Sequence, residues 1–145
     1  MRTPIAPIVS SMTANQQALV RQSFELLREN ARPFMLLFYG KLFEMDPSVR
    51  SLFHNDISLQ GRKLMDMLAE VVSSLENFQP LRSRLAELGR KHASYGVRSE
   101  QYETLTSALL WAIAQELEGS FNAATKEAWR LAITRVCEAM KSGVE

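Results

Sequence analysis

Cysteine is almost absent from this chain of 145 residues, which contains only Cys137. One cysteine excludes an intrachain disulfide and any zinc or iron–sulfur centre that is built from several cysteines. Scarce cysteine is also typical of proteins from a reducing compartment, and we therefore expect a cytoplasmic location. The simplest interpretation of Cys137 is an inert thiol packed in the core or at an interface.

Long hydrophobic runs and an excess of charge of one sign are missing as well. The longest uninterrupted apolar run covers residues 108–114, whereas a helix that spans a membrane needs about 20 apolar residues. Seventeen Lys and Arg against sixteen Asp and Glu leave a formal charge of +1. This balance provides no electrostatic attraction to nucleic acid or to acidic membranes, so we expect neither as a partner.

The sequence also lacks any sustained alternation of apolar and polar residues. Such alternation, with a period of two, is the pattern of a half-buried strand. Helical periodicity instead runs through almost the whole chain after Met12. Residues 1–12 lack it, and we interpret them as an extension that precedes a single domain of residues 13–145. The sequence therefore predicts an all-α domain with six long helices and one short one.

Residues typical of helix N-termini recur along the chain and predict where the individual helices begin. Thr13 and Gln16 have the spacing of a capping box, in which each side chain bonds to the backbone N–H of the other. Asp46 followed by Pro47 predicts a short helix that runs to Phe53. Further candidate caps with short polar side chains are Ser58, Ser99 and Asn122.

Three polar side chains fall on helix faces that are otherwise apolar. His92 lies four residues after Leu88 on one apolar stripe, and Gln60 lies four residues before Leu64 on another. Tyr39 is placed among phenylalanines on a third. Each one alone is more commonly a core residue whose hydrogen bonds are satisfied by its neighbours. Together they predict a pocket with apolar walls and three inward polar groups.

Histidine is too scarce for a zinc site made of protein ligands. Only His54 and His92 are present, and no carboxylate stands at ligand spacing from either. A site with two or three His ligands would need both, although their contexts differ completely. A single histidine suffices for iron when a porphyrin supplies four other ligands, so this kind of site stays open.

Four stretches of the chain carry a family resemblance, and they read FMLLFYGKLF, DPSVRSLFHNDISLQGRKLM, LAELGRKHASYGVRSEQY and KEAWRLAI. They are spread over nearly the whole region from Thr13 onwards. Through them the chain resembles a globin. It is most similar to bacterial single-domain haemoglobins of the flavohaemoglobin lineage, particularly the Hell's Gate type. The resemblance implies a globin fold, with six to seven helices around a pocket for haem b.

The resemblance also assigns roles to individual residues. His92 matches the histidine that binds the haem iron, and the Leu88 carbonyl is placed to accept a bond from its second nitrogen. Tyr39 and Gln60 match residues that hydrogen-bond a bound gas. The other residues expected to contact the haem are Phe53, Leu64, Lys63, Lys91 and Tyr102.

Two of these roles have a simpler alternative. Lys63 and Lys91 would pair with the haem propionates, but lysines that merely face water fit the sequence at least as well. His54 is a weaker candidate for a sixth iron ligand.

Two positions depart from the flavohaemoglobin pattern. In that lineage a tyrosine and a glutamate of the last helix support the iron-binding histidine, whereas the corresponding positions here carry Ile133 and Val144. Without the carboxylate, we expect reversible gas binding rather than cleavage of O–O bonds. We also expect no FAD- or NAD-binding domain in a chain of this length, so that reduction would need an external reductase.

The first functional hypothesis is therefore storage, delivery or scavenging of dioxygen, which two hydrogen-bond donors hold tightly. One alternative is a nitric oxide dioxygenase that works with an external reductase. Another is a gas-sensing module. Partners are dioxygen and other diatomic gases, and the sequence is compatible with a monomer and with a homodimer.

Overall fold

The computed structural model describes residues 12–53 and 56–144, and within these ranges it contains helices and no strand. The elements in chain order are α1 (Ala14–Glu29), α2 (Ala31–Met45), the 3-10 helix η2 (Pro47–Leu52), α3 (Ile57–Ser73), α4 (Gln79–Ser94), α5 (Gln101–Leu117), the 3-10 helix η3 (Glu118–Ser120) and α6 (Ala123–Ser142). The prediction of an all-α protein is confirmed. The expected extension, apart from Met12, and the candidate ligand His54 lie outside the described residues.

The first and last helices begin where the sequence predicts. The Oγ1 atom of Thr13 accepts a hydrogen bond from the Gln16 backbone at 3.0 Å, and Gln16 Oε1 accepts from the Thr13 backbone at 3.0 Å. This reciprocal pair is the predicted capping box. At the start of α6, the Asn122 side chain accepts from the Thr125 backbone N–H at 2.9 Å. Both caps satisfy N–H groups that have no partner within their helix.

Two predicted caps are wrong. The helix α3 begins before Ser58, and the Asp56 carboxylate is its cap, accepting from the Ser58 backbone N–H at 3.0 Å. Asp56 is the cap because it stands directly before the first helical residue, from where its carboxylate accepts the backbone N–H of the first turn. The helix α5 begins after Ser99, with Glu100 at the cap position and no side-chain bond there.

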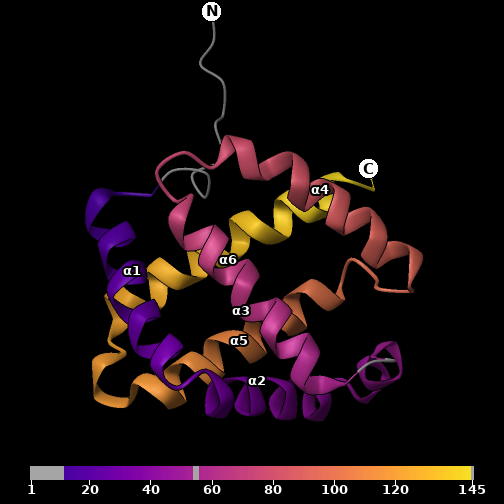
Figure 1. Ribbon diagram of the computed structural model, residues 1–145, viewed down its shortest axis with the longest axis horizontal. Coiled ribbons are helices and arrows are strands. Elements are labelled where there is room, and N and C mark those ends of the chain that lie inside the picture. The colour runs from indigo at the N-terminus through magenta and orange to yellow at the C-terminus, as the bar shows by residue number, and fades with distance from the viewer. Residues whose placement is uncertain (1–11, 54–55, 145) are drawn as a thin grey trace, which may run out of the picture.

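The most extensive contacts between helices are those of α2 with α5 and of α4 with α6. Figure 1 shows α3 crossing the molecule between α2 and α4, in front of α5 and α6. The largest side chains with almost no exposure are Trp129, Phe24, Phe34, Leu27, Leu75, Leu85, Ile113 and Val20. None of the helices in the described ranges has the length and apolar content needed to cross a bilayer.

Candidate functional site

His92 lies in the last turn of α4, and its imidazole is held by its own helix. Its Nδ1 lies 3.0 Å from the Leu88 carbonyl oxygen, as the spacing of four residues predicts. A carbonyl oxygen can only accept, so Nδ1 carries the proton and Nε2 keeps a free lone pair. This bond also fixes the orientation of the ring, which is the arrangement that a metal-binding histidine requires.

The surroundings of His92 keep the imidazole neutral. Burial lowers its pKa below the ordinary value for histidine, and the bond to Leu88 opposes this shift only in part. Desolvation disfavours the charged form of a base, so Nε2 is unprotonated at neutral pH. A neutral imidazole with one free nitrogen is competent as a metal ligand.

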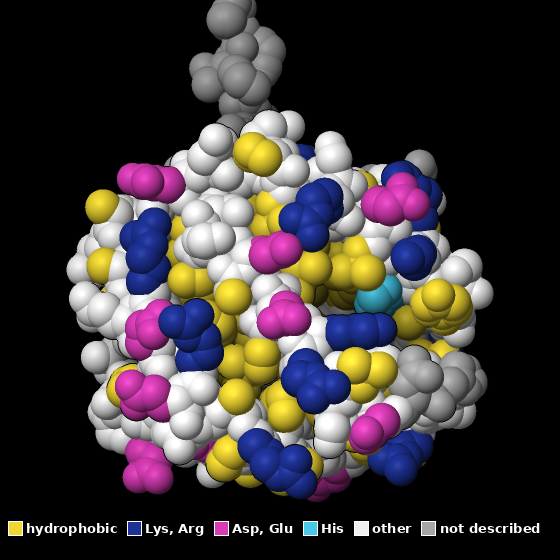
Figure 2. All heavy atoms as spheres, viewed as in Figure 1, with side chains coloured by type: hydrophobic (Ala, Val, Ile, Leu, Met, Phe, Trp, Pro, Cys, Tyr) yellow, Lys and Arg dark blue, Asp and Glu magenta, His cyan; other side chains and the backbone are white. Residues whose placement is uncertain are grey.

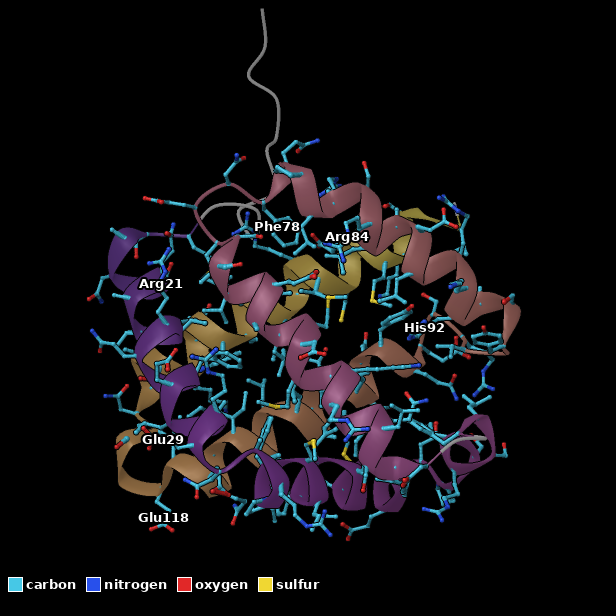
Figure 3. All side chains as sticks on the ribbon, in the orientation of Figure 1. Arg21, Glu29, Phe78, Arg84, His92 and Glu118 are labelled. Carbon is cyan, nitrogen blue, oxygen red and sulfur yellow. The ribbon has the colours of Figure 1, made fainter. Side chains whose placement is uncertain are left out.

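A hydrophobic hollow opens beside the His92 side chain (Figure 2). Figure 2 shows His92 in cyan at the edge of a depression whose inner surface is hydrophobic. Figure 3 places His92 on the side of α4 that faces α3 and the interior. In the described ranges, no three His, Cys, Asp or Glu side chains gather in a metal-binding group. A single histidine beside an apolar hollow fits iron in a porphyrin, which brings four ligands of its own, and does not fit a protein-only metal centre.

Tyr39 and Phe53 meet, although 14 residues separate them in the sequence. Their ring centroids lie 5.4 Å apart, edge to face, and Phe43 contacts both rings at 6.0 Å and 5.3 Å. Tyr39 is only 5% exposed, and burial strongly raises the pKa of its hydroxyl. No hydrogen bond within the described ranges uses that hydroxyl, which leaves a protonated donor at the aromatic cluster.

Gln60 and Leu64 lie one turn apart on α3, and both side chains are half-buried. Gln60 stands in the first turn of the helix, and its backbone N–H bonds to the Asp56 carbonyl at 3.1 Å. Leu64 packs against the hydrophobic core. The two lysines predicted to meet haem propionates, Lys63 and Lys91, are both exposed. Their interpretation as haem contacts stays a prediction.

A cation lies over the ring of Tyr102, the residue of α5 that is predicted to contact haem. Tyr102 is buried on α5, and Lys141 Nζ lies 5.8 Å from the centre of its ring. Burial, and to a lesser extent the nearby Cys137, raises the pKa of the Tyr102 hydroxyl. Of the two departing positions, Ile133 is buried, whereas Val144 is 54% exposed. Among the described residues, no carboxylate hydrogen-bonds His92 or Tyr102.

Cys137 is buried on α6, and its Sγ lies 3.6 Å from Thr106 Oγ1. Burial is the main cause that raises the pKa of this thiol. The thiol is therefore protonated and unreactive, in agreement with its simplest interpretation.

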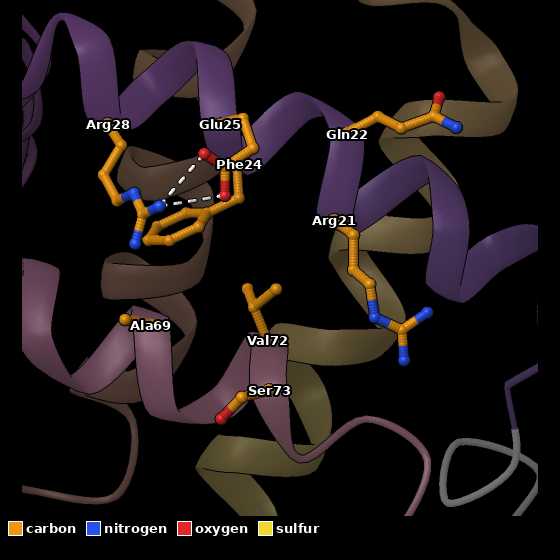
Figure 4. Close-up of a pocket in the computed structure, with 8 residues that line it drawn as sticks. All are labelled: Arg21, Gln22, Phe24, Glu25, Arg28, Ala69, Val72 and Ser73. Atoms are coloured by element: carbon orange, nitrogen blue, oxygen red, sulfur yellow. Dashed lines mark hydrogen bonds and ion pairs between the residues drawn. The ribbon is translucent and has the colours of Figure 1, made fainter.

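Two surface grooves lie elsewhere and do not include His92, Tyr39 or Gln60. One separates α2 from α3 and has Met35, Leu59 and Lys63 in its walls. The other separates α1 from α3, and its residues are shown in Figure 4. There Arg28 is bonded to Glu25 at 3.0 Å and lies over the Phe24 ring, so its charge is already compensated. Neither groove brings the predicted site residues together.

Two residues near the site were not predicted. Phe43, four residues after Tyr39, completes the aromatic cluster, and this helical spacing is a signal that the sequence contains. Gln101 is buried; its Oε1 accepts from the Arg98 backbone at 2.8 Å, and its Nε2 donates to Asp46 at 3.4 Å. Gln101 therefore joins the start of α5 to the end of α2, a contact that no local pattern reveals.

Comparison with known proteins identifies relatives over most of the chain. The family model described as Globin matches residues 36–140. Neuroglobin-1 of Oncorhynchus mykiss is 27% identical over 149 aligned positions, which cover 93% of this chain and 94% of that protein.

Solved structures of bacterial proteins have the same fold. A bacterial globin from Campylobacter jejuni superposes with a TM-score of 0.79 at 23% identity, over 90% of this chain and 95% of that one. A Pseudomonas aeruginosa protein, described as structurally highly homologous to a human hemoglobin, has a TM-score of 0.79 at 27% identity. It is matched over 89% of this chain and 98% of that one.

Proposed function

The chain belongs to the globin family, whose members bind haem and diatomic gases, and on this premise we propose that it binds haem b through His92 and takes up dioxygen reversibly. The haem would be held without a covalent link to the protein. Covalent attachment uses two cysteines in a C-x-x-C-H motif, whereas this chain has one cysteine, and it is buried on α6.

The observation that carries the proposal is the state of His92. Its imidazole is neutral and lies at the edge of a hydrophobic hollow (Figure 2), its Nδ1 is bonded to Leu88, and its Nε2 makes no hydrogen bond with the described residues. An ordinary core histidine would use both nitrogens for hydrogen bonds within the protein. Among the described residues, the imidazole of His92 makes only the bond from Nδ1.

Each residue of the site would have a separate task. Haem, when bound, would supply an iron ion that takes up a diatomic gas. His92 anchors the group, and Phe53 with Leu64 provides apolar walls that exclude water. Tyr39 and Gln60 contribute an O–H and an N–H donor, each of which stabilises a polar ligand such as dioxygen more than carbon monoxide.

Removal of the imidazole tests the proposal. We expect the purified wild-type protein to bind one haem per chain and to show a Soret band, and His92→Ala to lose most of this haem. Added imidazole should restore part of it, because the ligand then enters from solution. Phe121→Ala, between η3 and α6, serves as a control for general loss of a partly buried side chain. Unchanged haem content in His92→Ala would refute the assignment.

Nitric oxide dioxygenase activity is the second candidate, and the surroundings of His92 favour reversible binding over it. A carboxylate bonded to the imidazole would raise its basicity and promote O–O cleavage, whereas the bond that this imidazole makes among the described residues runs to the Leu88 carbonyl. We therefore expect low peroxidase turnover with hydrogen peroxide. Nitric oxide turnover with an external reductase, at a rate equal to that of a flavohaemoglobin under the same conditions, would favour the enzyme.

We propose that the chain is a bacterial single-domain haemoglobin of the flavohaemoglobin lineage, with residues 13–145 as its globin domain. The motifs around Tyr39, Gln60 and His92 support this lineage. Spectra of the dioxygen and carbon monoxide complexes, compared with those of known members, would test it.

A further inference from the structure

At two points of the crossing between α4 and α6, backbone packs directly on backbone. A Cβ atom on Gly89 would overlap the Met140 carbonyl oxygen and lie 2.8 Å from Met140 Cα. A Cβ atom on Gly143 would overlap the Ala86 carbonyl oxygen and lie 3.1 Å from Ala86 Cα. Because each glycine touches a carbonyl of the other helix, the two helices meet at two points one turn apart.

Hydrogen bonds reinforce these two contacts. The Met140 carbonyl that packs on Gly89 also accepts from the Gly143 backbone N–H at 3.1 Å. The Arg90 side chain reaches across and donates to the Gly143 carbonyl at 3.4 Å. We name this arrangement of Gly89, Gly143 and the Ala86 and Met140 carbonyls the glycine crossing.

His92 follows Gly89 by three residues, which is less than one helical turn. The Leu88 carbonyl that holds the imidazole belongs to the residue directly before Gly89. A shift of α4 at the crossing therefore carries both the imidazole and its hydrogen-bond partner with it. A side chain can change its rotamer to accommodate a new methyl group, but a backbone carbonyl in a helix cannot, so the whole helix must move.

We propose that the glycine crossing positions His92 and thereby determines how far the imidazole projects into the haem site. This inference rests on the proposed function, because it concerns the same histidine. Gly89 and Gly143 are positioning residues, which act on the site only through α4. The proposal predicts that added volume at the crossing changes the bond between histidine and iron.

Gly89→Ala and Gly143→Ala test the proposal from opposite sides of the crossing, and Gly40→Ala is the matched control. Gly40 is also a helical glycine, but a Cβ there meets no atom within 4 Å. We expect both crossing variants to shift the iron–histidine stretching band in resonance Raman spectra of the ferrous protein. We also expect them to lose haem to an excess of a haem-accepting protein roughly tenfold faster or more. Gly40→Ala should match wild type in both measurements.

A second background separates positioning from general destabilisation. In His92→Gly supplied with imidazole, the iron ligand is no longer attached to α4. Gly89→Ala should therefore leave the iron–imidazole band unchanged in this background. The proposal would be overturned if Gly89→Ala shifted the band equally in His92→Gly supplied with imidazole. It would also be overturned if Gly89→Ala caused no shift in the protein that keeps His92. If Gly89→Ala does not fold, Gly143→Ala is measured in both backgrounds, because its methyl group lies at the end of α6.

Failure of the proposed function would be visible separately, as absence of a Soret band in wild type. The haem-free protein then tests the crossing by itself. Gly89→Ala should shift the backbone amide resonances of residues 88–94 and of the last turn of α6, whereas Gly40→Ala should shift those of α2. Unchanged resonances around residue 92 in Gly89→Ala would overturn the proposal.

Discussion

At the residue scale, Tyr39 and Gln60 differ in how firmly the protein holds them. Tyr39 is enclosed by Phe43 and Phe53, which restrict its ring to one orientation. Gln60 is half-buried in the first turn of α3, where its longer side chain has more freedom. A donor that is already oriented loses less entropy when it bonds a ligand. We therefore expect the Tyr39 bond to be the stronger of the two.

Loss of either donor should speed the release of dioxygen. A bond that contributes about 1.4 kcal/mol to the bound state alone raises the dissociation rate constant about tenfold when it is lost. We expect an effect of this order from Gln60→Leu and a larger one from Tyr39→Phe. Tyr39→Phe removes only the hydroxyl, and Gln60→Leu keeps most of the volume. Stopped-flow dissociation from wild type, both single variants and the double variant measures the effects and their coupling. If neither single variant releases dioxygen faster, the two donors do not act on the ligand.

The hydroxyl of Tyr39 should remain a donor up to high pH. Burial raises its pKa above the ordinary value of 10.0, so its contribution to dioxygen retention should not change between about pH 7 and pH 10. Stability should behave differently above that range. The unfolded state releases the tyrosine proton first, so the free energy of unfolding falls as pH rises beyond about 10.

Urea denaturation between about pH 8 and pH 11 measures this loss of stability. Tyr39→Phe should show a smaller decline than wild type, because its residue 39 cannot ionise. Tyr95→Phe is the control, since Tyr95 is 64% exposed. A decline as steep in Tyr39→Phe as in wild type would contradict the expected shift.

At the scale of elements, the caps show which helix ends rely on a side chain. Asn122 bonds to the Thr125 backbone N–H at the start of α6, whereas Ser99 makes no such bond at the start of α5. Asn122→Ala should therefore lower the free energy of unfolding by about 1 kcal/mol. Ser99→Ala should change it by less than about 0.5 kcal/mol. Urea denaturation of both variants in the same haem state measures these changes. Equal losses of unfolding free energy in the two variants would contradict the assignment of the caps.

The start of α5 has a different support. Gln101 bonds to the Arg98 backbone and to Asp46 at the end of α2, so a contact between distant segments replaces a local cap. The bond from Gln101 to Asp46 also contributes to a lowered pKa of the Asp46 carboxylate, for which the hydrogen bond from the Ser48 side chain is the largest cause. Tyr39 and Phe43 lie on α2 as well, and this link therefore joins their helix to the segment that follows His92.

At the scale of the whole molecule, a buried hydrogen bond joins the first helix to the last. The Trp129 indole N–H on α6 donates to the Ser23 hydroxyl on α1 at 2.7 Å, and this hydroxyl donates to the Leu19 carbonyl at 2.7 Å. Ser23→Ala leaves the indole N–H without its acceptor in the core, so it should lower the free energy of unfolding by about 1–3 kcal/mol.

The matched control for this variant is Ser73→Ala. Its hydroxyl also bonds to a carbonyl of its own helix, that of Glu70, but it is exposed and receives no bond from a distant residue. Its removal should change stability by less than about 0.5 kcal/mol. Thermal and urea denaturation measure both variants. A Ser23→Ala protein as stable as Ser73→Ala would show that the bond between α1 and α6 contributes nothing.

The sequence by itself determined the features that depend on neighbours within one helical turn. The capping box of Thr13 and Gln16, the cap at Asn122 and the bond between His92 and Leu88 all join residues three or four positions apart. Helix geometry brings such residues together whatever surrounds them. The apolar stripes likewise predicted that Tyr39 points inward, because helical period alone selects the buried face.

Only the tertiary structure decided the contacts between distant segments. The meeting of Tyr39 with Phe53 depends on the turn after α2, and Gln101 needs Asp46, 55 residues away. In the sequence, nothing distinguishes Gly89 from another helical glycine. The structure shows that α6 approaches so closely that a side chain at this position would overlap the Met140 carbonyl. Such contacts depend on how whole helices pack, and packing is set by the shapes of all the buried side chains together.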